Sequence, residues 1–102
     1  MSNTDLIAPI EAEWEPESGF LWKARHGQFD QTGFERTLAK LRALTIDESV
    51  DLPRRLVAVM WYMPIFLSWQ TERIGETGGD LEAYSKAVTS ITNEVERILG
   101  TP

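Results

Sequence analysis

The sequence predicts an all-α fold, a small helical bundle of three long helices and one short helix with an extended N-terminal arm. The first reason is residues 56–67, LVAVMWYMPIFL, which are apolar on every side of a helix and must therefore be surrounded by other groups. The second is residues 81–98, where apolar side chains recur at alternating steps of three and four, as in helices packed along a seam. Prolines and glycines separate the expected segments.

The length of the chain bounds the number of domains. With 102 residues, it has room for one hydrophobic core. Hydrophobic residues make up 42% of the chain, which is enough to build that core. We expect an acidic N-terminal arm over residues 1–16 and a single helical-bundle domain over residues 17–102.

Cysteine content and hydropathy bear on the location of the protein. The chain has no cysteine, so it has no disulfide and no thiolate metal ligand. Its first ten residues lack the basic start and the apolar run of a signal peptide. The central apolar stretch is shorter than the roughly 20 residues that cross a bilayer, and Pro64 interrupts it. These features predict a cytoplasmic protein that does not enter the membrane.

The charge of the chain indicates the class of partner. The formal net charge is −6 at pH 7, and residues 1–20 contain five acidic side chains and no basic one. An acidic chain repels the phosphates of nucleic acids, which argues against a nucleic-acid partner. A basic protein is the partner that this charge attracts.

The N-terminal region contains one short periodic stretch. Residues 10–15 alternate apolar and acidic side chains, which is the period of an extended strand. Pro9 and Pro16 bound this stretch, and no second strand is visible in the sequence. We therefore expect an extended arm laid across the helices, with Ile10 and Trp14 facing inward. A short edge-to-edge pairing between two copies of the chain is the alternative.

Two helices are expected after the arm. The first is short and covers residues 17–26, where apolar side chains fall on one side. The second covers residues 30–43 and begins at Asp30, which is a favourable N-cap residue. Its basic side chains Arg36 and Lys40 lie four residues apart and are expected on the solvated side.

The central and last helices follow. Pro53 suits the first position of the central helix, which we expect to reach Gly75. Pro64 removes a backbone donor, so the sequence predicts a kink there, with two helices meeting at Pro64 as the alternative. The last helix is expected over residues 81–99, with Asp80 as its N-cap.

Four glutamates and one tryptophan of the arm form the first candidate site, for binding a partner. They are Glu11, Glu13, Trp14, Glu15 and Glu17. In an extended chain the first three carboxylates project to one side, roughly 7 Å apart, where they would meet a row of arginines on a partner. Two alternatives stay open: solvated side chains, or ion pairs with basic residues of the same chain. Those basic residues are Lys23, Arg25, Arg36 and Lys40.

The central helix and its end supply the second candidate site, a dimer or ligand surface. Its residues are Trp61, Tyr62, Phe66, Trp69 and Glu72. Aromatic residues at helical spacing are usually core, but a bundle this small has few elements to cover every side of one helix. A two-fold homodimer would bury the face that is left. The alternative is a small-molecule pocket of aromatic and methionine side chains near the kink at Pro64.

The sequence lacks a recognisable set of catalytic or metal-binding residues. His26 is the only histidine, whereas a zinc site or a histidine base needs further partners. The glycine-rich stretch 75–80 lacks the lysine of a phosphate-binding loop and is interpreted as a turn. The acidic residues of 47–51 match no calcium-binding loop. We expect no catalytic residues, no metal and no cofactor.

These observations favour a non-catalytic protein-binding module. A concrete version is an acidic neutraliser of a basic protein, such as an immunity-type inhibitor of a nuclease toxin. The alternative is a small-molecule-binding helical homodimer. An enzyme ranks last, because only carboxylates are available for acid–base chemistry.

Overall fold

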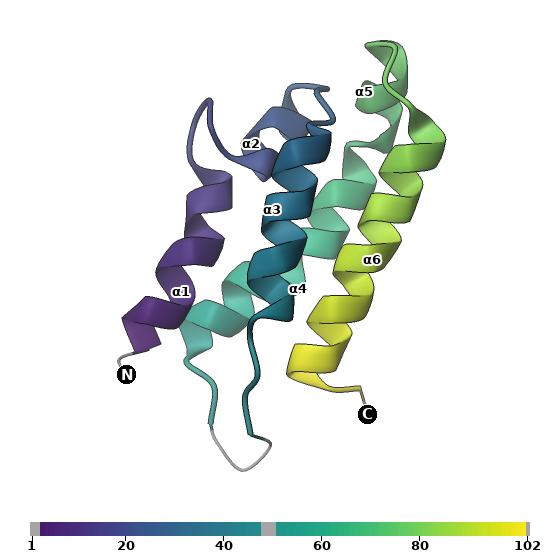
Figure 1. Cartoon of the computed structure of the whole chain (residues 1–102). Helices are drawn as coiled ribbons and strands as arrows, with labels where there is room; N and C mark the ends of the chain where they lie inside the picture. The colour runs from purple at the N-terminus through teal and green to yellow at the C-terminus, as the bar shows by residue number, and fades with distance from the viewer. Residues whose placement is uncertain (1–2, 48–50, 102) are drawn as a thin grey trace.

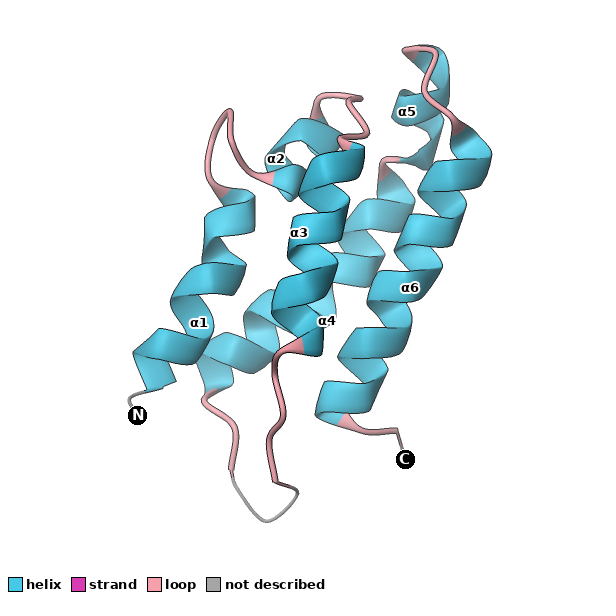
Figure 2. Cartoon of the chain, viewed as in Figure 1, coloured by secondary structure: helices cyan, strands magenta, loops and turns pink. Residues whose placement is uncertain are grey.

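The computed structural model describes residues 3–47 and 51–101, and every regular element within them is a helix (Figure 2). The predicted all-α class is therefore confirmed. In chain order the elements are α1 (Asn3–Glu11), the 3-10 helix η1 (Ala12–Trp14), α2 (Phe20–Arg25), α3 (Gln31–Arg42), α4 (Arg54–Trp69), α5 (Thr71–Glu76) and α6 (Leu81–Leu99).

The helices form two layers around one core. In the view of Figure 1, α1, α3 and α6 lie side by side in front, and α4 passes behind them and contacts α1 and α6. The short helices α2 and α5 lie at the end of the molecule far from both termini. The largest fully buried apolar side chains come from all of these elements: Ile10, Phe20, Leu21, Leu41, Leu56, Met60, Met63, Leu67, Ile74, Tyr84 and Ile91.

The two apolar faces of α4 have different surroundings. One face, which carries Leu56, Met60, Met63 and Leu67, is fully buried in the core. On the other face the exposed fraction is 50% for Trp61, 37% for Ile65 and 64% for Trp69. The rest of the described chain covers only one side of this helix, so the second side is exposed. We call Trp61, Ile65 and Trp69 the outer face of α4.

The predicted extended arm is wrong. Residues 3–11 form α1 and residues 12–14 form η1, so the chain is helical where an alternating pattern predicted a strand. The same residues also fit a helix, since Ile10, Glu13 and Trp14 have the i, i+3, i+4 spacing that a helix gathers on one side. Ile10 and Glu13 are both buried. This segment packs onto the same core as the other helices.

The central helix ends earlier than the sequence predicts. It was expected to reach Gly75, but α4 stops at Trp69 and α5 begins at Thr71. Side-chain donors satisfy carbonyl groups at the break, since Ser68 Oγ donates to the carbonyl of Ile65 (2.9 Å) and Thr71 Oγ1 donates to that of Ser68 (2.9 Å). The redirected chain then buries Ile74 in the core.

Helix α4 runs through Pro64 without interruption. The alternative of two helices meeting at this proline is therefore wrong, and the kink stays a prediction. The break at Gln70 is held to the last helix by Tyr84 of α6, whose buried hydroxyl donates to the carbonyl of Leu67 (2.5 Å). Burial raises the pKa of this hydroxyl, so the group stays protonated and keeps donating.

The remaining boundaries follow local signals. Helix α6 covers the expected residues, and the carboxylate of Asp80 accepts a hydrogen bond from the N–H of Ala83 (3.0 Å), as predicted for its N-cap. Helix α2 is shorter than the expected 17–26. Asp30 occupies the N-cap position of α3, and its carboxylate accepts a hydrogen bond from Lys23 Nζ (2.9 Å).

Candidate functional site

Glu13 is the centre of a buried ion-pair cluster. Its side chain is 1% exposed. Arg36 donates from Nε to Oε2 and from Nη2 to Oε1, both at 2.8 Å, and Lys40 Nζ donates to Oε2 at 2.6 Å. The N–H of Phe20 donates to Oε1 at 3.1 Å. Arg36 and Lys40, which were expected on the solvated side of α3, are partly exposed, and both also reach back to η1.

The surroundings of Glu13 keep it ionised. Burial raises the pKa of its carboxyl, but the hydrogen bonds from Arg36, Lys40 and the N–H of Phe20 outweigh this effect and lower the pKa to about 2. The carboxylate of Glu13 is thus paired inside the molecule, where it links η1 to α3 and to the start of α2. Glu13 therefore forms ion pairs with basic residues of the same chain, which is one of the alternatives that the sequence left open.

The other acidic residues of the first site do not form one row. Glu11 accepts a hydrogen bond from Arg55 Nε (2.7 Å), which links α1 to α4. Glu15 and Glu17 are exposed, and their carboxylates have no ion pair within the described residues. Glu17 has a positive φ of 71°, which marks a tight turn before α2. Within the described residues, two of the four carboxylates thus have no counter-charge, and of these two residues only Glu15 lines the groove described below.

Trp14 joins η1 to the aromatic side chains of α4. Its ring stacks on Tyr62 with centroids 6.1 Å apart and packs edge-on to Phe66 at 4.9 Å. Tyr62 in turn contacts Trp61 (5.9 Å) and Trp69 (5.8 Å). One connected set of rings thus extends from the core side of α4 to its outer face.

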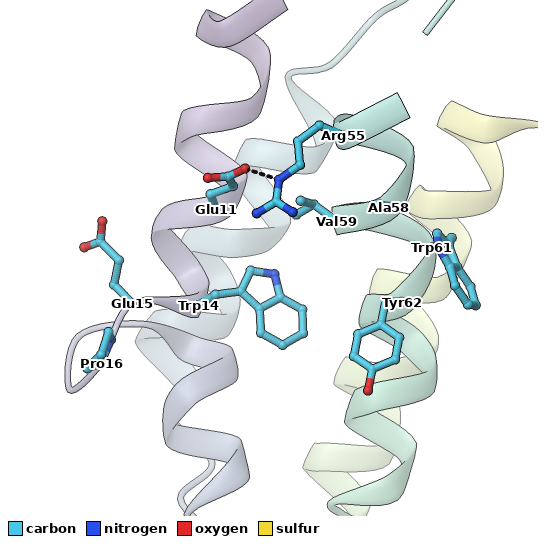
Figure 3. A pocket seen from close by; sticks show the side chains of 9 residues that line it. All are labelled: Glu11, Trp14, Glu15, Pro16, Arg55, Ala58, Val59, Trp61 and Tyr62. Atoms are coloured by element: carbon cyan, nitrogen blue, oxygen red, sulfur yellow. Dashed lines mark hydrogen bonds and ion pairs between the residues drawn. The ribbon is translucent and has the colours of Figure 1, made fainter. Parts of the chain in front are cut away.

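An open groove of about 630 Å³ lies between η1 and the first half of α4. Figure 3 shows Trp14 reaching from η1 toward Tyr62 on α4, with the ion pair of Glu11 and Arg55 at one end. The lining residues are Glu11, Trp14, Glu15, Pro16, Arg55, Ala58, Val59, Trp61 and Tyr62. The groove combines residues from the two candidate sites, which the sequence predicted as separate.

Some predicted residues lie elsewhere. Phe66 is buried beneath Trp14, Trp69 continues the outer face beyond the groove, and Glu72 is exposed on α5. Arg55 and Ala58 were not predicted. Their spacing of three residues, and of four from Ala58 to Tyr62, places them on one helix face, which is the signal that would have revealed them.

His26 has a local role. It ends α2, is exposed and stacks on Trp22 with centroids 4.1 Å apart. Within the residues that the structure describes, no three potential metal-ligating side chains gather. No helix in that same part of the chain is long and apolar enough to cross a bilayer.

No protein family, curated protein or solved structure matches this chain. The groove and the outer face of α4 are therefore the features of this chain that bear on its function.

Proposed function

We propose that this chain is a non-catalytic protein-binding module that acts through the outer face of α4 and the adjoining groove. The observation that carries the proposal is the exposure of Trp61 and Trp69, at 50% and 64%, on one face of a helix. Large apolar side chains that gather on a surface mark interaction sites. Tryptophan, tyrosine and arginine dominate the binding energy of protein interfaces.

The charge of the chain supports a basic protein as the partner. The net charge is −6, and the exposed residue Glu15 lies at the edge of the groove opposite Trp61. Opposite charge speeds the encounter of two proteins and favours the correct orientation. The concrete version is an acidic neutraliser, such as an immunity-type inhibitor. We place this function in the cytoplasm, since the chain has no cysteine.

Affinity capture from a native-host lysate at low salt tests the proposal. Three baits are compared: the wild-type chain, a Trp61→Ser/Trp69→Ser variant, and a Trp22→Ser control that removes a tryptophan of α2. We expect the wild type and the control to retain one basic protein that the double variant loses. Capture of the same proteins by all three baits would exclude the outer face as the binding surface.

A second copy of the chain is the second occupant that we propose for the outer face. Trp61, Ile65 and Trp69 lie four residues apart along one helix, and such a stripe is able to pair with itself across a two-fold axis. We expect light scattering after gel filtration to give the mass of two chains for the wild type at high micromolar concentration. The Trp61→Ser/Trp69→Ser variant should give the mass of one chain. A wild-type mass of one chain throughout the range rules the homodimer out.

A further inference from the structure

We infer that the groove between η1 and α4 binds the guanidinium group of an arginine in the partner protein. The inference rests on the proposed function and specifies the chemistry that the groove recognises. Three features of the described residues carry it: the aromatic lining, one unpaired carboxylate and the dimensions of the groove.

The aromatic lining suits a planar cation. Trp14, Trp61 and Tyr62 all line the groove, and the face of an aromatic ring attracts a cation within about 6 Å of its centroid. A guanidinium group is planar and weakly hydrated, so it stacks on such rings more readily than an ammonium group does. The chain already contains this contact, since the guanidinium of Arg25 lies 5.2 Å from the centroid of Phe66.

The charges that line the groove leave one carboxylate without a counter-charge. Glu11 and Arg55 neutralise each other through a contact of 2.7 Å. Glu15 is exposed, and its carboxylate has no ion pair among the described residues. An incoming arginine would therefore meet a net negative site. The Glu15 carboxylate points away from Trp14 in Figure 3, and this exposed side chain would turn toward the groove to accept hydrogen bonds from the guanidinium fork.

The dimensions of the groove favour an arginine within a protein over a free small cation. A volume of about 630 Å³ falls within the roughly 300–1,000 Å³ of sites that hold drug-sized ligands. A guanidinium group alone would leave most of this space empty. An arginine side chain with its neighbouring backbone would fill more of it, and the groove is open to solvent.

The test uses the full chain and two small probes, one cationic and one neutral. Acetyl-arginine amide carries the guanidinium, and acetyl-citrulline amide has nearly the same shape without a charge. The four tryptophans each give one indole N–H signal in a nitrogen-edited NMR spectrum. We expect the arginine probe to shift the Trp14 and Trp61 signals with saturable millimolar binding. The Trp22 signal should stay in place, and the citrulline probe should bind at least about threefold more weakly.

A matched pair of variants tests whether the charge of Glu15 contributes to binding of the arginine probe. Glu15→Gln removes the free carboxylate of the groove, and Glu17→Gln removes the same charge from an exposed residue outside the lining. We expect Glu15→Gln to weaken binding of the arginine probe about threefold to tenfold and Glu17→Gln to leave it unchanged.

Equal binding of the two probes, or equal effects of the two variants, would overturn the inference. This result is separable from the proposed function. A partner captured through the outer face of α4 would leave that function standing while the groove chemistry fails. Selective binding of the arginine probe without any captured partner would support the groove chemistry while the proposed function fails.

Discussion

Replacing Glu13 by glutamine is expected to lower the free energy of unfolding by about 3 kcal/mol, because it removes the anion from a buried ion-pair cluster. The amide oxygen of glutamine is able to accept the hydrogen bond from the N–H of Phe20. Its NH₂ group, however, is a donor that faces the donors of Arg36 and Lys40. Both cations are partly exposed, at 42% and 25% of their side chains, so water limits the cost.

The same carboxylate should give the protein a marked sensitivity to acid. The pKa of Glu13 falls from an ordinary 4.5 to about 2 in the folded chain, so the unfolded chain binds the proton more readily. The stabilisation is complete above about pH 5 and is lost as the pH falls through 4.5 toward 2. A shift of this size corresponds to roughly 3 kcal/mol.

Urea denaturation followed by circular dichroism between pH 7 and pH 3 measures both effects. The wild type should lose stability as the pH falls, and Glu13→Gln should show a flatter dependence. The control is Glu17→Gln, which removes an exposed carboxylate. This variant should lose stability at low pH as the wild type does. A Glu13→Gln variant as stable and as acid-sensitive as the wild type would show that the ion-pair cluster does not hold η1 to α3.

The second large effect is expected on partner affinity. Removing one tryptophan from the centre of an interface costs about 2 kcal/mol or more, which is roughly 30-fold in the dissociation constant. We therefore expect Trp61→Ser/Trp69→Ser to weaken binding of the captured partner at least about 100-fold. Calorimetric titration of the purified pair measures this change.

The folded state of that double variant should be little affected. Both side chains are half exposed or more, and surface substitutions of this kind usually change stability only slightly. An unchanged melting temperature would separate loss of contact from loss of fold. A dissociation constant within threefold of the wild type, in a variant that remains folded, would contradict the role of the outer face.

The sequence predicts those elements of the fold whose signals are local. Helix α6 has a repeating apolar spacing, an N-cap at Asp80 and a glycine at its end, so its bounds need no information from distant residues. The N-terminal segment differs, because six residues fit the period of a strand and of a helix equally well. Contacts made by Glu13 with residues 23 and 27 positions away favour the helical form.

The end of α4 and the groove could not be predicted from the periodicity of apolar residues in the sequence. No glycine or proline marks the break at Gln70, which depends on the side-chain donors of Ser68 and Thr71. The groove brings residues 11–16 against residues 55–62, and no pattern in the sequence specifies that pairing. The exposed outer face of α4 was foreseeable in part, since the apolar character of this helix exceeds what a small bundle covers.

Hydroxyl-radical footprinting of the complex with the captured partner tests the central claim most directly. Mass spectrometry reports the oxidation rate of each tryptophan side chain with and without the partner. We predict strong protection of Trp61 and Trp69, weaker protection of Trp14 at the groove, and no change at Trp22. Unchanged oxidation of Trp61 and Trp69 in a saturated complex would contradict the claim that the outer face of α4 binds the partner.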